Sequence, residues 1–127
     1  MLKRRITLIV FLAVLLASVA GKARSATNAE PKAYAIAEIT VTDPEAYKLY
    51  LAAVTPVVTQ FSGKYIVRAG TVVPIEGDAP TGRVVVIEFP NLNVAKSFES
   101  SAQYLAIAPL RQRASRTRLF LVEGTPQ

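Results

Sequence analysis

The stretch that decides the fold reads AYAIAEITVTDPE and spans residues 33–45. Residues 33–41 are rich in apolar and β-branched side chains, which predicts a strand. Asp43 and Pro44 then supply a helix N-cap and a first helical residue of fixed φ, and Glu45 places a negative charge near the positive end of the helix dipole. The sequence therefore predicts a strand that passes directly into a helix.

The segment from Glu45 to Phe61 carries apolar side chains at helical spacing, at positions 47, 50, 51, 54 and 58. This spacing predicts a helix with one buried face. Pro56 lacks a backbone N–H, so we expect it to kink or interrupt the end of the helix. Gly63 follows the helix and is expected to take the left-handed conformation found at many helix ends.

A hairpin is predicted after this helix. Residues 65–73 and 83–89 have the composition of strands, and the loop at 76–82 between them is rich in glycine, proline and aspartate. Strands joined by such a loop pair with each other.

A second helix is predicted to begin with Asn91 or Asn93 as its cap. Ser101 and Pro109 predict that this helix is broken into two pieces near Ser101. A last strand is predicted at residues 117–123. The order is β-α-β-β-α-β, which is the ferredoxin-like arrangement of an α+β domain.

In this arrangement we expect the strands at 33–41 and 83–89 to lie side by side as parallel central strands, with the helices on one face of the sheet. Both strands carry apolar residues on both sides, whereas a sheet with one face in water alternates between apolar and polar residues. We therefore expect two copies of the chain to pack sheet to sheet as a homodimer, with a cavity between them.

Residues 1–20 have the layout of a signal peptide. Lys3, Arg4 and Arg5 precede an apolar run at residues 6–20, and small residues follow. The run is shorter than the about 20 residues that a membrane-spanning helix needs. An uncleaved membrane anchor is the alternative, since a thinned bilayer accepts short spans.

The leader divides the chain into three parts. Cleavage is expected between residues 20 and 26, residues 21–32 form a polar lead-in, and residues 33–124 form a single domain of ordinary size. We expect export to the periplasm, with the extracellular medium as the alternative.

The amino-acid composition excludes several kinds of metal site and catalytic site. The chain has no His, Cys or Trp, which excludes histidine or cysteine ligation of haem, zinc or copper and also Ser-His or Cys-His catalysis. We expect no metal and no cofactor. Without Lys3, Arg4 and Arg5, the 12 remaining basic and 9 acidic residues give a net charge of +3, which is too small to indicate nucleic-acid binding.

A set of short segments occurs in a fixed order along the chain: residues 38–47 with Tyr50, 63–70, 76–77, 83–90, Ala95, Ser101, Tyr104 and 109–111. Taken together, these segments resemble the family known as domain of unknown function 1330, in the dimeric α/β-barrel superfamily. The resemblance runs from Tyr34 to Gly124 and departs from the family pattern at Ser62 and Phe98, where a glycine and a tryptophan are usual. It implies a ferredoxin-like fold paired as a dimeric α/β barrel, and it implies no particular activity.

Glu38, Arg68 and Glu88 form the first candidate site. Each glutamate stands five residues before a helix cap, so parallel central strands would place the two carboxylates side by side, with Arg68 on the next strand. Two carboxylates in one apolar space would raise one pKa, and Arg68 would keep the other ionised. The alternative is a buried ion-pair cluster that fixes the sheet register.

Tyr65, Tyr104 and Arg111 complete the candidate pocket. The tyrosine hydroxyls are suited to bind a ligand, although tyrosines at such positions also simply close a core. Arg111 belongs to a basic cluster with Arg113, Arg116 and Arg118, which either binds an anionic group or forms a solvated helix end.

Two functional classes fit these residues. The first is a module that binds a small anionic or aromatic molecule in the dimer cavity. The second is a cofactor-independent enzyme, such as an isomerase, lyase or monooxygenase-like protein, with Glu38 or Glu88 as base and Arg68 or Arg111 holding a developing anion.

Overall fold

The computed structural model describes residues 29–127, so the predicted signal peptide and most of the polar lead-in lie outside the described residues. The predicted α+β order is confirmed, with the second helix divided in two. Along the chain the elements are β1 (Ala33–Val41), α1 (Pro44–Gln60), β2 (Lys64–Arg68), β3 (Arg83–Phe89), α2 (Leu92–Ser100), α3 (Ala102–Ala114) and β4 (Ser115–Glu123).

The four strands form one sheet in the order β2-β3-β1-β4, and every neighbouring pair is antiparallel. The expectation of parallel central strands is therefore wrong. The crossover through α1 makes β1 and β2 point the same way, and the hairpin then reverses β3 relative to both. As a result Glu38 lies opposite Val84, and Glu88 lies opposite Tyr34 at the other end of the strand pair.

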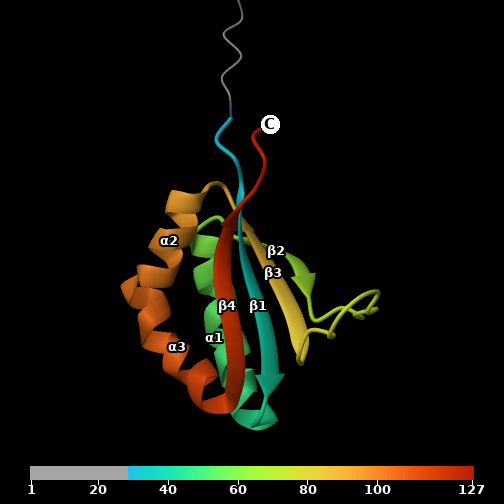
Figure 1. Ribbon diagram of the computed structural model, residues 1–127. Coiled ribbons are helices and arrows are strands. Elements are labelled where there is room, and N and C mark those ends of the chain that lie inside the picture. The colour runs from blue at the N-terminus through green and yellow to red at the C-terminus, as the bar shows by residue number, and fades with distance from the viewer. Residues whose placement is uncertain (1–28) are drawn as a thin grey trace, which may run out of the picture.

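The helices lie on one face of the sheet, and within residues 29–127 the other face is uncovered (Figure 1). On β1, Ala33, Ala35, Ala37 and Ile39 are buried on the helix side. The alternate residues of β1 point to the uncovered face. No helix in the described part of the chain has the length and apolar character needed to cross a membrane.

Side-chain caps define the helix ends. Asp43 accepts a hydrogen bond from the Ala46 N–H at 3.1 Å, as its predicted N-cap role requires. The cap of α2 is Asn91, which accepts from the Val94 N–H. Ser101 ends α2 and caps α3 by accepting from the Tyr104 N–H, so the predicted break is confirmed.

The structure decides two local details. Helix α1 continues through Pro56, so of the two effects expected there, a kink or an interruption, the interruption does not occur. The left-handed residue after α1 is Ser62, with φ 58°, and not Gly63. Gly63 is required for a different reason, because a Cβ at this position would lie 2.7 Å from Val58 Cγ1.

Strand β2 ends at Arg68, five residues before the predicted end at Val73. Ala69 adopts a positive φ of 57°, and its N–H donates to the Val84 carbonyl at 2.9 Å. This conformation turns the chain out of the sheet, so the residues from Gly70 to Gly82 form a loop.

An aromatic cluster holds the layers together at one end of the domain. Phe98 of α2 lies 5.1 Å from Phe89 of β3, 5.8 Å from Phe61 at the end of α1 and 4.7 Å from Tyr104 of α3, measured between ring centroids. Phe89 and Phe98 are almost fully buried. Because Phe89 pairs with Ala33, the cluster lies at the start of β1.

Gly77 and Gly82 offer a matched test of the loop that joins β2 to β3, because both have a positive φ, of 72° and 68°. A Cβ on Gly77 would meet nothing within 4 Å, whereas a Cβ on Gly82 would collide with the backbone carbonyl of Ile39. We expect Gly77→Ala to cost about 1–2 kcal/mol of unfolding free energy, which is the cost of the left-handed conformation alone. Gly82→Ala should cost about 1–3 kcal/mol more, because the backbone must also shift.

Urea unfolding measures both losses through the transition midpoint. Equal losses for the two variants would show that the contact between this loop and β1 does not constrain the fold.

Candidate functional site

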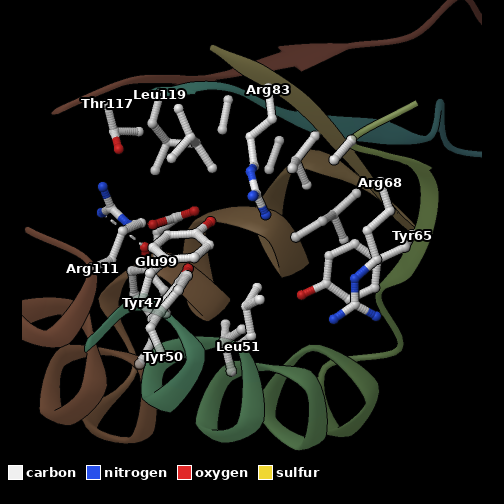
Figure 2. A pocket seen from close by; sticks show the side chains of 18 of the residues that line it. Tyr47, Tyr50, Leu51, Tyr65, Arg68, Arg83, Glu99, Arg111, Thr117 and Leu119 are labelled. Carbon is white, nitrogen blue, oxygen red and sulfur yellow. Dashed lines mark hydrogen bonds between the residues drawn. The ribbon is translucent and has the colours of Figure 1, made fainter. Parts of the chain in front are cut away.

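A pocket with a volume of about 300 Å³ lies between the helices and the sheet, inside one chain (Figure 2). Residues on the helix-facing side of the sheet form its apolar floor. They include Ala35 and Ala37 of β1 and Val85 and Ile87 of β3. These side chains face the helices because they alternate along their strands with residues of the uncovered face. The two alanines leave room that larger residues would fill.

Helix α1 forms the opposite wall with Tyr47, Tyr50, Leu51 and Val54. Their spacing of three and four residues places them on one face of the helix. The Tyr47 and Tyr50 rings lie 5.6 Å apart. Burial raises the pKa of both hydroxyls above the usual 10.0. These hydroxyls therefore stay protonated at neutral pH and can donate hydrogen bonds into the pocket.

Three arginines line the pocket, and each lies near a tyrosine ring. The guanidinium carbon of Arg68 is 4.2 Å from the centre of the Tyr65 ring. The corresponding distance is 5.1 Å for Arg83 and Tyr47, and 5.9 Å for Arg111 and Tyr50. In Figure 2, Arg83 extends into the cavity from the sheet, with Arg111 and Arg68 on opposite sides of it.

Arg111 is the most deeply buried of the three, with 9% of its surface exposed. Its Nη2 donates to the Tyr104 hydroxyl at 3.2 Å, and its Nε is buried without a hydrogen-bond partner among the described residues. Burial lowers the pKa of Arg111, but the Tyr104 and Tyr50 hydroxyls raise it by more. The guanidinium therefore stays charged and keeps one donor for another group.

Glu99 of α2 is the carboxylate among the residues that line the pocket. It is partly buried and lies near Arg111 (Figure 2). Burial raises the pKa of Glu99 above its usual 4.5, although the charge of Arg111 acts in the opposite direction. Glu99 thus combines an accessible carboxylate with a proton affinity higher than that of a surface glutamate.

The charge of the pocket is not balanced. In residues 29–127 the ion pairs are Lys32–Glu88, Lys48–Glu45 and Arg118–Glu38, and none involves a pocket arginine. Three guanidinium groups and one carboxylate therefore line a largely apolar pocket, in which Arg68 is exposed and donates to the Thr55 hydroxyl at 3.0 Å. Such a space attracts anions.

The predicted site residues divide between the two faces of the sheet. Tyr65, Arg68, Tyr104 and Arg111 line the pocket. Glu38 and Glu88 do not, because they lie on the uncovered face and at opposite ends of the strand pair. The expected cluster of Glu38, Arg68 and Glu88 is therefore not formed.

Each of the two glutamates has its own partner instead. Glu38 accepts hydrogen bonds from Arg118 at 2.9 and 3.1 Å, and Glu88 accepts one from Lys32 at 2.8 Å. The expected cavity lay between two subunits, whereas this pocket lies within one chain, on the helix side of the sheet.

The basic cluster at the end of α3 is also divided. Arg111 faces the pocket, Arg113 is exposed in the last helical turn, and Arg116 and Arg118 are exposed on β4. The four charges do not form one anion-binding surface. No group of three or more His, Cys, Asp or Glu residues that could hold a metal ion occurs among residues 29–127.

Sequence reasoning assigned no pocket role to Tyr47, Tyr50, Arg83 or Glu99. The sequence contains only weak indications that Arg83 and Glu99 point toward the pocket. Arg83 alternates with Val85 and Ile87 on one face of β3, and Glu99 follows Ala95 by one helical turn on the inward face of α2. A charged residue on an inward face is a signal for a pocket.

Glu99→Gln tests the burial of this carboxylate. Since burial raises the pKa of Glu99 in the folded state, the carboxyl group stabilises the fold most below its unfolded value and loses that contribution as pH rises through the folded value. We expect Glu99→Gln to be more stable than the unmodified chain at pH 7, with a smaller difference at pH 4. Thermal unfolding at the two pH values measures this, and a difference that grows toward pH 4 would contradict it.

Comparisons with known proteins agree with this fold. The structure is similar to that of RPA0582, a protein of unknown function from Rhodopseudomonas palustris, with a TM-score of 0.61 and 19% identity over 76% of this chain and 84% of that chain. It is also similar to SnoaB, a cofactor-independent oxygenase from Streptomyces nogalater, with a TM-score of 0.50 and 14% identity over 76% of this chain and 96% of that chain. At these identities the likeness shows the fold alone.

Among curated proteins, none matches the chain. Residues 32–125 match the family described as Domain of unknown function (DUF1330). The match covers nearly the whole described part of the chain, and the chain therefore belongs to the DUF1330 family.

Proposed function

We propose that the protein binds a small organic anion with a planar, apolar body in the pocket between its helices and its sheet. The observation that carries this proposal is Arg111, a buried guanidinium whose Nε has no partner among the described residues. A buried donor without a partner costs free energy, and a charged one costs more. A ligand carboxylate or enolate that accepts from Arg111 would remove this cost.

The other residues of the pocket suit both the negative charge and the apolar body of such a ligand. Arg68 and Arg83 add positive charge that no carboxylate neutralises within residues 29–127. Tyrosine rings, alanines and aliphatic side chains supply surfaces for an apolar body. A volume of about 300 Å³ is at the lower end of the range for small-molecule sites, which is about 300–1,000 Å³.

Binding of phenylacetate, compared with neutral phenylacetamide, tests the proposal by calorimetry. We expect phenylacetate to bind more tightly, because only its carboxylate pairs with the arginines. Arg111→Met should weaken phenylacetate binding about 10- to 100-fold, which corresponds to the loss of a hydrogen bond to a charged group. The methionine is of similar length and is apolar, so it suits a buried position.

Arg113→Met is the matched control, because Arg113 lies in the same last turn of α3 but is exposed. The affinity of the Arg113→Met variant for phenylacetate should equal that of the unmodified chain. Equal affinity for acid and amide, or equal losses in the two arginine variants, would overturn the proposal.

A cofactor-independent enzyme is the second candidate, and Glu99 favours it. Glu38 and Glu88 were the expected bases, but both lie outside the pocket and in ion pairs. Glu99 lines the pocket and forms none of the ion pairs found in residues 29–127.

We also propose that two copies of the chain pair through the uncovered face of the sheet. Ile36 lies between Val86 and Phe120 on this face, and Phe120 and Val122 are each about two-fifths exposed. Contiguous apolar surface of this kind is typical of interfaces. In keeping with the predicted leader, we place this dimer in the periplasm.

Phe120→Glu tests the pairing. The substitution puts a charge on the apolar face, on the edge strand β4, so it should convert a dimer into a monomer without loss of folding. Leu49→Glu is the control, because Leu49 is also exposed but lies on α1. Native mass spectrometry measures the subunit count, and a monomeric unmodified chain or a dimeric Phe120→Glu variant would contradict the pairing.

A further inference from the structure

We propose that the pocket also catalyses proton transfer at a carbon atom beside a carbonyl group of its bound anion, with Glu99 as the base and Arg111 holding the oxygen that becomes negative. This inference rests on the proposed binding of a small anion, and it names the reaction that the same site would perform. Its basis is the arrangement of Glu99, Arg111 and Tyr104 at one side of the cavity.

Glu99 is set apart from the other carboxylates of the described chain. The ion pairs of residues 29–127 occupy Glu38, Glu45 and Glu88. The Asp43 side chain caps α1, and Glu30 accepts from the Asn91 amide. The remaining carboxylates, Glu76, Asp78 and Glu123, are exposed and do not line the pocket. Glu99 instead lines an apolar pocket, on α2. Its oxygens are therefore available to accept a proton from a bound molecule.

The surroundings of Glu99 suit a general base. Burial raises the pKa of its carboxyl group, and a base with a higher pKa removes a proton from carbon more readily. The charged and titratable groups that share the pocket with it are Arg111 and Tyr104 from α3, Tyr47 and Tyr50 from α1, Arg83 from β3, and Tyr65 and Arg68 from β2. Strand β4 contributes the uncharged Thr117 and Leu119.

Arg111 is suited to stabilise the product of that step. Its Nε is a buried donor without a partner, and its Nη2 is held by the Tyr104 hydroxyl at 3.2 Å. The Arg111 carbonyl also accepts from the Ser115 hydroxyl at 2.7 Å, which fixes the backbone at the end of α3. A fixed, charged donor in an apolar space stabilises a developing oxyanion without having to reorganise.

The step balances without any further reactant. The C–H bond breaks and its proton moves to a Glu99 carboxylate oxygen, giving the neutral acid. The electron pair forms a carbon–carbon double bond, and the carbonyl oxygen takes the negative charge beside Arg111. Exchange of the Glu99 proton with the solvent, followed by return of a solvent proton to the same carbon, exchanges hydrogen at that carbon. In a ligand with a conjugated double bond, return of the proton to the far carbon of the conjugated system isomerises the ligand.

Phenylpyruvate is the probe for this step, because it has an aromatic ring, a carboxylate and a methylene group next to a ketone. The purified chain is mixed with phenylpyruvate in deuterated buffer, and loss of the methylene signal is followed by NMR. The unmodified chain should accelerate the exchange beyond the buffer rate. Glu99→Gln should reduce this acceleration about 100-fold or more, which is the usual contribution of a general base, while the variant still binds phenylpyruvate at least as tightly as the unmodified chain, because it removes a negative charge from the pocket.

Two further variants make the result specific. Glu76→Gln removes an exposed carboxylate of the loop and should leave the exchange unchanged. Glu99→Asp keeps the charge but withdraws it by one methylene group, so it should also lose most of the acceleration. The accelerated exchange should rise with pH through a value above 4.5, the usual pKa of this group, because only the ionised carboxylate accepts a proton.

The outcomes separate the two proposals. Binding of phenylpyruvate without acceleration, or full acceleration in Glu99→Gln, overturns proton transfer and leaves the binding site intact. Failure of phenylpyruvate to bind where phenylacetate binds also overturns proton transfer alone. Failure of both acids to bind overturns the binding proposal, and proton transfer with it.

Discussion

The packing of Phe98 sets the separation between the helices and the sheet on which the pocket depends. Its ring contacts Phe89 of the sheet, Phe61 at the end of α1 and Tyr104 of α3, so three elements are held apart by one aromatic side chain. Beyond this cluster the helix side of β1 carries only Ala35 and Ala37 before Ile39. The aromatic cluster keeps the helices away from the sheet at one end, and the small alanine side chains of β1 do not fill the gap beyond it. The unfilled space is the cavity.

The contents of this cavity differ from those of an ordinary core. Buried charges are costly unless they are paired. Arg111 is buried and Arg83 is half-buried, whereas Arg68 is exposed and donates to the Thr55 hydroxyl at 3.0 Å. None of the three forms an ion pair found in residues 29–127. The tyrosine rings beside them offset part of this cost through contacts between cation and ring. An anionic ligand would remove the rest of this free-energy cost. The arginines therefore indicate a binding site, because unpaired buried charges do not stabilise a fold.

The sheet separates two roles. Residues on the helix side of β1 and β3 form the floor of the pocket, whereas the alternate residues form an apolar band bordered by the ion pairs Glu38–Arg118 and Lys32–Glu88. A ligand site and a pairing surface can therefore exist on opposite sides of the same strands. The residues that line the pocket lie on the helix side of the sheet, away from the face proposed for pairing.

Local sequence patterns were enough to predict the element order, the bounds of β1 and β3, the cap at Asp43, the break near Ser101 and the family, because these follow from local spacing, local hydrogen bonding and ordered short motifs. They also identified Tyr65, Arg68, Tyr104 and Arg111 as candidate pocket residues. Tertiary structure alone decided the direction of β3 relative to β1, which separates Glu38 from Glu88, and the early end of β2 at the positive φ of Ala69. The tertiary structure also places Glu99 and Arg83 in the pocket. Side chains from different elements meet only where strand direction and the distance between layers allow it, and no single segment of sequence contains that information.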